Sequence, residues 1–319
     1  MTRTDQYAPL AVTTRNGHDE SLHHGALVAL DADGSVAFAV GDPSVEIYPR
    51  STIKPLQAAV MVDAGLDLTP ELLALVCASH DGAAEHLAGV RRILAVAGLD
   101  EGSLANTADL PFDAATARKA LMRGEGASRL AQTCSGKHAG MLVTSVINGW
   151  PADASYLDSE HPLQQRILAA FASTAGEEPA HVGVDGCGSP APVITLVGTA
   201  RMLRSITTGA AGPGGLRVAD AMRNHPDMVG GPARPVSLLM SGISGLIAKD
   251  GAEGVCVAGL PDGRTVALKV ADGAPRPFAP VLFSALDRLG IDVSGVAASG
   301  RHSFVRGHGA VVGEVLSLL

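Results

Sequence analysis

The sequence predicts an α+β fold in which both chain ends contribute strands to one antiparallel sheet and the middle of the chain is mainly helical. Two turns flanked by β-prone runs carry this prediction. The Asp-Ala-Asp-Gly turn at 31–34 divides the run 25–41 into a hairpin, and Pro-Asp-Gly at 261–263 divides 254–270 in the same way. A last strand pair is expected within 303–315. Hairpins that enclose a helical middle favour this architecture over a parallel βαβ fold.

Helical patterns fill the segment between these hairpins. Thr69 and Pro70 begin one expected helix as N-cap and first-turn proline, and Gly98 ends another over 83–97. Further helices are expected over 113–122, 136–148, 159–174 and 277–289. Because no repeat or low-complexity linker interrupts the chain, we expect one single unit over 1–319, with sheet-forming segments at about 20–50 and 250–319 and the helical middle at about 51–250.

The composition excludes several classes of protein. The chain has 24 Lys and Arg against 32 Asp and Glu, a net charge of −8, so nucleic acid is not an expected partner. The longest weakly polar stretch, 235–248, is shorter than the roughly 20 residues that span a bilayer, so no membrane partner is expected. Four cysteines are few for a disulfide scaffold, and the start lacks an apolar signal segment. We therefore expect a cytoplasmic location.

Ser51 and Lys54 form the most suggestive local pair. Pro55 fits only the first turn of a helix, so both residues lie at the mouth of that helix. Residues three positions apart share a helix face, and the positive field of a helix N-terminus favours a serine alkoxide beside a neutral amine. The spacing alone equally fits Ser51 as an N-cap and Lys54 as a solvated lysine.

Ser79 and Lys269 are further candidates whose local patterns leave two interpretations open. Ser79, in the string Cys-Ala-Ser-His-Asp-Gly at 77–82, is either a second hydroxyl in the same pocket or a cap of the following helix. Lys269 interrupts an apolar strand, so it lies either on the solvent side or at a site that needs a second ammonium. The string Lys-Asp-Gly-Ala-Glu-Gly at 249–254 is typical of an exposed turn before the hairpin.

The four cysteines divide into two groups. Cys134 and Cys187 each lie in a polar turn rich in glycine, where two thiolates either converge on a soft metal such as zinc or are reduced cysteines in packed turns. Cys77 and Cys256 lie in apolar runs and are expected to be core residues.

Taken together, these strings resemble the asparaginase II family, the rhizobial-type L-asparaginases. RSTIKPLQA, ASHDG, CSGKHAGML, DGCGSPAP, HPDMVGG, KDGAEGV and ALKVADG occur in this order between about residue 20 and the C-terminus, and the ordered set is far more specific than any one string. The resemblance implies hydrolysis of L-asparagine to L-aspartate and ammonia. It also implies a fold related to serine β-lactamases and penicillin-binding proteins.

The resemblance further implies roles for single residues and a homodimer. Matched motif by motif, its two Ser-Lys tandems fall on Ser51, Lys54, Ser79 and Lys269. Its zinc ligands, two cysteines and a lysine, correspond to Cys134, Lys137 and Cys187. Positions that hold the substrate or order the site match Arg50, His138 and Asp185. Thr133 departs from the family pattern, where Asn more often precedes the cysteine.

On this basis we expect Ser51 to attack the amide with Lys54 as general base, while Ser79 and Lys269 relay protons to the departing ammonia; an exchange of roles between the two serines stays open. We expect zinc to be auxiliary. Two alternatives remain: a glutaminase or another amidohydrolase of the same fold, and a non-catalytic metal or redox sensor that uses Cys134 and Cys187.

Overall fold

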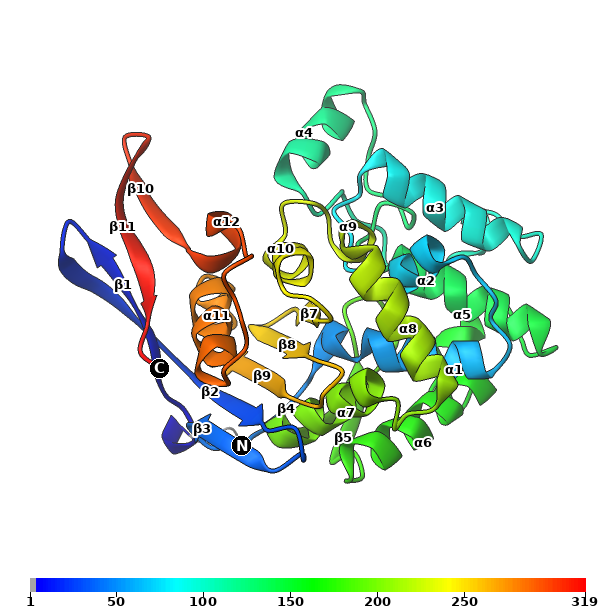
Figure 1. Cartoon of the computed structure of the whole chain (residues 1–319). Coiled ribbons are helices and arrows are strands. Elements are labelled where there is room, and N and C mark those ends of the chain that lie inside the picture. The colour runs from blue at the N-terminus through cyan, green and yellow to red at the C-terminus, as the bar shows by residue number, and fades with distance from the viewer. Residues whose placement is uncertain (1–3) are drawn as a thin grey trace.

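Both chain ends build one antiparallel sheet of eight strands, as the sequence predicts (Figure 1). The computed structural model describes residues 4–319. The strand order is β10-β11-β1-β2-β9-β8-β7, and β3 also pairs with β2. The strands are β1 (Ala8–Arg15), β2 (His18–Leu30), β3 (Val36–Val40), β7 (Ile247–Gly251), β8 (Val255–Gly259), β9 (Thr265–Val270), β10 (Phe304–Gly307) and β11 (Ala310–Ser317). The three expected hairpins, β2–β3, β8–β9 and β10–β11, are thus confirmed.

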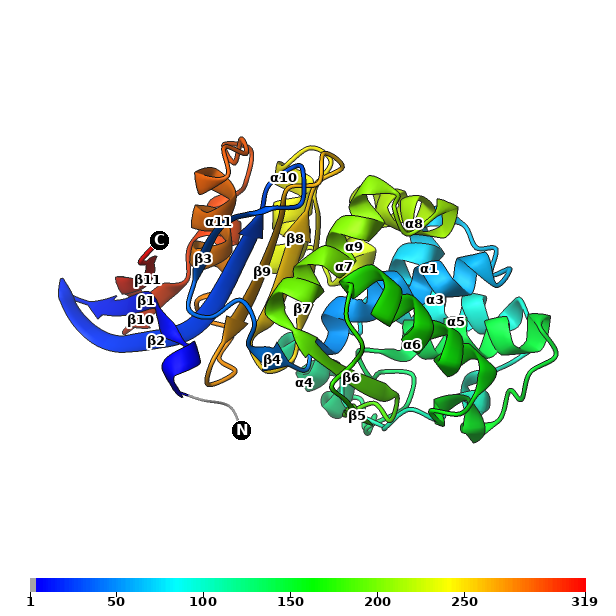
Figure 2. The same ribbon diagram turned by 90° about the horizontal axis from the view of Figure 1, so that it is seen from below.

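The two chain ends meet along β2 and β9, which pair from Gly25 opposite Val270 to Leu30 opposite Thr265. Residues 26–30 are fully buried, because α7 (Leu196–Thr208) covers one face of the sheet and α11 (Phe278–Arg288) covers the other (Figure 2). A strand buried on both faces needs a continuous apolar run, which Ala-Leu-Val-Ala-Leu supplies. The outer strands β1, β10 and β11 extend away from the helices (Figure 1).

The middle of the chain is largely helical, and most of its helices pack on the side of the sheet that α7 covers (Figure 2), whereas α10 (Pro235–Gly242) lies beside α11. They are α1 (Lys54–Asp63), α2 (Pro70–Val76), α3 (Ala84–Ala95), α4 (Ala114–Met122), α5 (Ser135–Ile147), α6 (Pro162–Ala175), α7, α8 (Pro213–Asn224), α9 (Pro226–Val229) and α10 (Pro235–Gly242). The short helix α12 (Ala298–Arg301) follows α11. A second antiparallel sheet, not predicted from the sequence, has the order β4-β6-β5 and joins Glu46–Ile47, Pro190–Thr195 and His181–Val184.

The helix ends follow local chemistry. The Asp113 side chain accepts a hydrogen bond from the backbone of Thr116 at 2.7 Å and caps α4. Pro70 occupies the first turn of α2, where its missing N–H has no helical partner to lose. Gly98 has a φ of +69° in the turn that follows α3, a conformation that glycine adopts without steric cost.

The core is aliphatic, and three lysines are buried inside the protein, namely Lys54, Lys137 and Lys249. Cys77 and Cys256 are buried core residues as predicted, and all four cysteines are free thiols. Lys54 and Lys249 are exposed by only 1% and 0%, although lysine is almost never fully buried without partners. Within residues 4–319 no helix is long and apolar enough to cross a membrane. The buried lysines therefore point to the functional site.

Candidate active site

Ser51 and Lys54 lie at adjoining elements rather than within one helix. Ser51 belongs to a 3-10 turn, η2 (Arg50–Ile53), and Lys54 is the first residue of α1. Lys54 Nζ lies 2.5 Å from the carbonyl oxygen of Ala78 and 3.2 Å from Ser79 Oγ. Within residues 4–319 the Ser51 hydroxyl makes no hydrogen bond to Lys54, so the expected pairing of these two residues is not formed.

Ser79 instead lies between two lysines. Its Oγ is 3.2 Å from Lys54 Nζ and 2.9 Å from Lys249 Nζ. The backbone of Ser79 is fixed by a 2.9 Å hydrogen bond from its N–H to the carbonyl oxygen of Val229. Ser79 follows α2 in the chain, and its side chain is 8% exposed. The structure thus joins the second predicted serine to the first predicted lysine.

The second lysine beside Ser79 is Lys249, and the structure does not bring Lys269, the lysine predicted for this role, to either serine. Lys269 Nζ donates to the carbonyl oxygens of Glu253 and Val270, at 2.5 and 2.7 Å, rather than to either serine. It lies on β9, two strands inside the sheet edge formed by β7, which is roughly 10 Å away at the usual strand spacing. The edge strand β7 and its neighbour β8 are the strands that pack against η2.

Lys249 belongs to strand β7, so the expectation of an exposed turn at 249–254 is also wrong for its first residues. Gly251 lets this strand approach η2 closely: a Cβ at that position would lie 3.0 Å from the carbonyl oxygen of Pro49 and 3.3 Å from the Ser51 nitrogen. The apolar run Leu-Ile-Ala directly before Lys249 was the signal in the sequence for a buried strand.

Lys249 carries a carboxylate partner, whereas Lys54 has none within residues 4–319. Asp250 Oδ1 is 2.7 Å from Lys249 Nζ, and Nζ also donates to the Asp250 carbonyl oxygen at 2.6 Å. Burial lowers the pKa of Lys249, and Asp250 opposes that shift. Burial would raise the pKa of Asp250, but Lys249 and Arg234 hold it well below its usual range. Asp250 is therefore an anion at neutral pH.

A cavity of about 380 Å³ opens beside the serines. Its polar wall includes Ser51, Ser79, Thr133, Arg234, Asp250 and Glu253, and its apolar wall includes Phe112, Pro235, Pro275 and Phe278. Volumes of this order are typical of small-molecule sites. Thr133, the departure from the family pattern, lines the cavity and donates its hydroxyl to the carbonyl oxygen of His80 at 3.0 Å.

The residues matched to zinc ligands converge beside this centre. Lys137 Nζ lies 3.2 Å from Cys187 Sγ and 2.8 Å from Ser189 Oγ. Cys134 Sγ is 3.1 Å from Lys54 Nζ and is hydrogen-bonded to Cys187. Two thiols and an amine form a donor set that suits a soft metal. Within residues 4–319, no group of three or more His, Cys, Asp or Glu residues is placed to hold a metal ion.

The two thiols differ in charge. The hydrogen bond from Cys134 and the ammonium of Lys137 lower the pKa of Cys187 against the effect of burial. The same hydrogen bond, together with burial, raises the pKa of Cys134. Burial would lower the pKa of Lys137, but the neighbouring cysteines raise it overall. Without a metal, this cluster is therefore a thiolate, a thiol and an ammonium.

Arg50 and Asp185, both matched to substrate positions, form an ion pair. Arg50 Nη2 and Nε lie 2.7 and 2.9 Å from Asp185 Oδ1. Arg50 has a φ of +54°, an unusual conformation for a residue with a side chain and one that clusters at functional sites. Burial would raise the pKa of Asp185, but Lys137 and Arg50 lower it overall.

His138 is fully buried and neutral, because burial and Lys137 hold its pKa well below the usual range. Its Nδ1 is 2.8 Å from the hydroxyl of Tyr156, which accepts from the N–H of Ala105. Among the described residues the other ring nitrogen, Nε2, has no hydrogen-bond partner.

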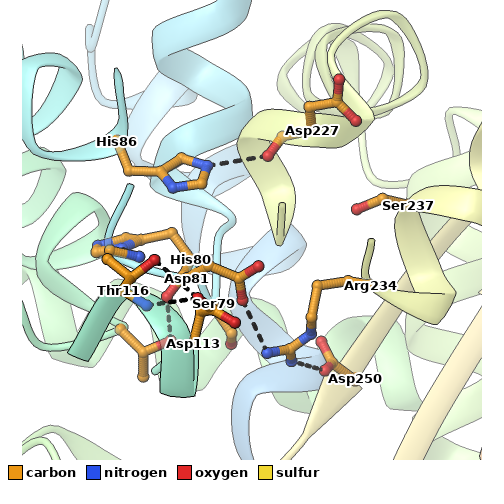
Figure 3. Close-up of polar contacts among 12 residues, drawn as sticks. Ser79, His80, Asp81, His86, Asp113, Thr116, Asp227, Arg234, Ser237 and Asp250 are labelled. Carbon is orange, nitrogen blue, oxygen red and sulfur yellow. Dashed lines mark hydrogen bonds and ion pairs between the residues drawn. The ribbon is translucent and has the colours of Figure 1, made fainter. Parts of the chain in front are cut away.

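The sequence did not single out Arg234, Asp81 and Asp250, which surround this site (Figure 3). The Arg234 guanidinium bridges the two carboxylates: Nη1 is 3.2 Å from Asp81 Oδ1, and Nη2 bonds to Asp250 Oδ2. Two carboxylates on separate segments have no shared spacing in the sequence, so only the folded chain brings them together.

The fold and the comparisons with known proteins define a hydrolase that acts on amides. The model of the L-asparaginase II family matches residues 11–317. The chain therefore belongs to the L-asparaginase II family, as the motifs indicated. No curated protein matches it.

Several solved structures are similar to this chain. One is a probable glutaminase from Bacillus subtilis complexed with 6-diazo-5-oxo-L-norleucine, at 13% identity and a TM-score of 0.39, over 84% of this chain and 85% of that chain. Another is a putative beta-lactamase from Bacteroides dorei, at 18% identity and a TM-score of 0.44, over 83% and 92%. With TM-scores below 0.5, these likenesses say nothing about what this chain cleaves.

Proposed function

We propose that this protein is an L-asparaginase that hydrolyses the side-chain amide of L-asparagine to L-aspartate and ammonia, with Ser79 as nucleophile. The observation that carries the mechanism is the position of Ser79 Oγ between Lys54 Nζ and Lys249 Nζ. Membership of the L-asparaginase II family supports asparagine as the substrate. The roles of Ser51 and Ser79 are thereby exchanged relative to the first expectation.

The hydrogen bonds around Ser79 favour different charges on the two lysines. Lys249 Nζ has three acceptors, the Asp250 carboxylate, the Asp250 carbonyl oxygen and Ser79 Oγ, which match the three donors of an ammonium. The Ser79 proton then has Lys54 Nζ as its acceptor. A neutral Lys54 amine keeps two N–H donors for Ala78 and Cys134, so Lys54 is placed as general base and Lys249 as proton donor.

The proposed reaction balances with these groups alone. The Ser79 proton passes to Lys54 while Oγ bonds to the amide carbon and forms a tetrahedral oxyanion. The C–N bond breaks as Lys249 protonates the leaving nitrogen, which releases ammonia and leaves an acyl ester on Ser79. Water then attacks the ester and gives one proton to Lys249. The C–Oγ bond breaks, and Oγ recovers its proton from Lys54, so both lysines return to their first state.

Arg50, His138 and Asp185 are proposed to bind or order the substrate. Their support is the family match, the ion pair of Arg50 with Asp185, and the unpartnered Nε2 of His138. An amino acid substrate brings one carboxylate and one ammonium, which suit an arginine and an aspartate respectively. Ser51 lines the same cavity as Ser79, so its hydroxyl is proposed as a substrate contact rather than the nucleophile.

Cys134, Lys137 and Cys187 are proposed to hold an auxiliary zinc ion. Their support is the convergence of two thiols and an amine, together with the family match. A bound zinc ion would supply a Lewis acid or order the neighbouring groups. Because Lys137 must lose its proton to bind a metal, occupancy is expected to fall as pH falls. A homodimer and a cytoplasmic location remain proposals that rest on the family resemblance and the sequence composition.

Ammonia release from the purified protein tests this function. The wild type is expected to release ammonia from L-asparagine much faster than from L-glutamine, with and without chelator. Ser79→Ala is expected to abolish release, and Lys269→Met is the matched control that should leave it near wild type. Release from glutamine alone would make the protein a glutaminase. No release from either, with Cys134 and Cys187 still binding metal or oxidising reversibly, would support the sensor alternative.

A further inference from the structure

Arg234 holds two carboxylates that belong to different parts of the active site (Figure 3). It lies at the N-terminal end of α10, and its side chain is 15% exposed. One partner, Asp81, is two residues after Ser79; the other, Asp250, is next to Lys249. The ring of Phe112 covers the guanidinium, with its centroid 4.3 Å away. Arg234 thus joins the segment of the nucleophile to the strand of the proton donor.

The link from Arg234 to Lys249 runs through one carboxylate. Asp250 uses Oδ2 for Arg234 and Oδ1 for Lys249, so its side chain is held from both sides. Lys249 Nζ in turn lies 2.9 Å from Ser79 Oγ. A shift of Asp250 would therefore move the donor relative to the nucleophile, and a misplacement of about 1 Å at a reacting group costs up to about 10²-fold in rate.

The charges of this cluster cancel only when Lys249 is protonated. Arg234 and Lys249 supply two positive charges, and Asp81 and Asp250 supply two negative ones. None of these side chains is exposed by more than 15%. At such burial an unpaired charge is strongly unfavourable, and an arginine cannot lose its proton to relieve it. Arg234 is therefore a fixed positive charge in a balanced set.

We propose that Arg234 is a positioning residue that sets the place and the charge of Lys249 beside Ser79 by holding Asp250 and Asp81. The inference rests on the proposed role of Ser79 and Lys249 in amide hydrolysis. Arg234 makes no hydrogen bond to Ser79 or Lys249 within residues 4–319, so it acts through its carboxylate partners.

The groups around Lys249 decide whether its pKa rises or falls when Arg234 is replaced. Asp250 lies on the same strand, Lys54 faces it from α1, Cys77 from the end of α2, and Cys256 from β8. Burial, Lys54 and Arg234 lower the pKa of Lys249, and Asp250 raises it. Loss of the Arg234 charge removes a lowering contribution. The pKa of Lys249 should then rise, and activity that needs its ammonium should persist to higher pH.

Steady-state kinetics over a pH series test this inference. Arg234→Met is expected to lower kcat for asparagine by about 10- to 100-fold, to change KM by less than about threefold, and to move the alkaline limb of the kcat profile to higher pH. The double variant Arg234→Met with Asp81→Asn removes one charge of each sign, so it should recover part of kcat and return the limb toward that of the wild type. Arg217→Met, which removes a surface arginine paired with Asp67, is the control and should match the wild type.

Two results would overturn the inference. A rise in KM with kcat and the limb unchanged would make Arg234 a substrate contact, and a fall in kcat with an unmoved limb would leave only a structural role. If Arg234→Met does not fold, Arg234→Lys is the second variant, because it keeps the charge but cannot bond both carboxylates with a planar fork. Arg234→Lys should lower kcat without moving the alkaline limb of the kcat profile. An unchanged kcat in this variant would contradict the inference. A wild type inactive on asparagine would instead overturn the proposed function, and the inference with it.

Discussion

Two lysine-centred clusters lie side by side in this protein, and they differ in what faces their amines. In one, Lys54 and Lys249 flank the hydroxyl of Ser79, which lines a cavity of about 380 Å³. In the other, Lys137 faces the sulfur of Cys187. A hydroxyl between two amines suits proton transfer to and from a nucleophile, whereas thiols beside an amine suit charge storage or metal binding. The chemical role that each lysine can play is thus set by the groups that face its amine.

Within residues 4–319 one side-chain hydrogen bond joins the two clusters, from Lys54 Nζ to Cys134 Sγ at 3.1 Å. Through this contact, a change in the charge of the thiols would alter the electrostatic environment of Lys54, the proposed general base. The serine cluster should therefore be essential for activity and the thiol cluster should modulate it. The following changes test that difference.

The largest effect is expected for Lys249. Lys249→Met should lower kcat/KM for asparagine by about 10³-fold, because it removes the proposed proton donor. Lys269→Met removes the lysine first matched to this role, and it should leave kcat/KM within about twofold of the wild type. Comparable losses in both variants, with both proteins folded by circular dichroism, would contradict the assignment of Lys249.

A smaller loss is expected in the thiol cluster. Elemental analysis should show that Cys134→Ser and Cys187→Ser no longer bind zinc. Both variants should lose activity by about tenfold, the loss typical of residues that adjust a site without being essential to it. Cys77→Ala alters a core cysteine and should keep the metal. Unchanged zinc content in both serine variants would rule out the metal site, and loss of all activity would make the metal essential.

The ion pair of Arg50 and Asp185 should contribute to stability in a pH-dependent way. The pKa of Asp185 is lowered in the folded protein, so its contribution is present above its unfolded pKa of about 3.9 and is lost as pH falls through the folded value. Asp185→Asn should lower the free energy of unfolding by about 2 kcal/mol at pH 7.

Urea unfolding at pH 7 and at acid pH measures this difference, which should shrink below about pH 4. Asp67→Asn is the control, because Asp67 pairs with Arg217 at the surface and is 86% exposed. A deficit of Asp185→Asn that stays constant over the whole pH range would show that the carboxylate charge is not its cause.

The smallest effect is expected for Thr133. Its hydroxyl donates to the carbonyl oxygen of His80 at 3.0 Å while its side chain lines the cavity. Thr133→Val keeps the shape and removes the hydrogen bond, worth about 1 kcal/mol, so KM for asparagine should change by less than about fivefold. A change of more than a hundredfold in KM would place the hydroxyl on the substrate instead.

The sequence predicted those features that depend on local patterns. Turn residues flanked by β-prone runs located the hairpins, and glycine-rich strings located Ser79, Cys134 and Cys187. The order of the strings indicated the family. The convergence of Lys137 with Cys187 and of Arg50 with Asp185 agrees with the residues that the resemblance brought together.

What the sequence could not supply is the set of long-range neighbours. Lys249 and Lys269 both lie in β-prone runs, and only the folded chain shows that Lys249 is on the edge strand, which contacts η2. Ser51 and Lys54 were expected on one helix face, but the helix begins at Lys54 and Ser51 lies in the preceding 3-10 turn. The carboxylates of Asp81 and Asp250 come from segments far apart in the chain.

The central claim, that Ser79 rather than Ser51 is the nucleophile, is tested most directly by trapping the acyl-enzyme from L-asparagine by rapid acid quench and mapping the modified peptide by mass spectrometry. The position of Ser79 between Lys54 and Lys249 predicts an added aspartyl group on Ser79, seen in the wild type and absent from Ser79→Ala. An adduct on Ser51 that persists in Ser79→Ala would contradict it.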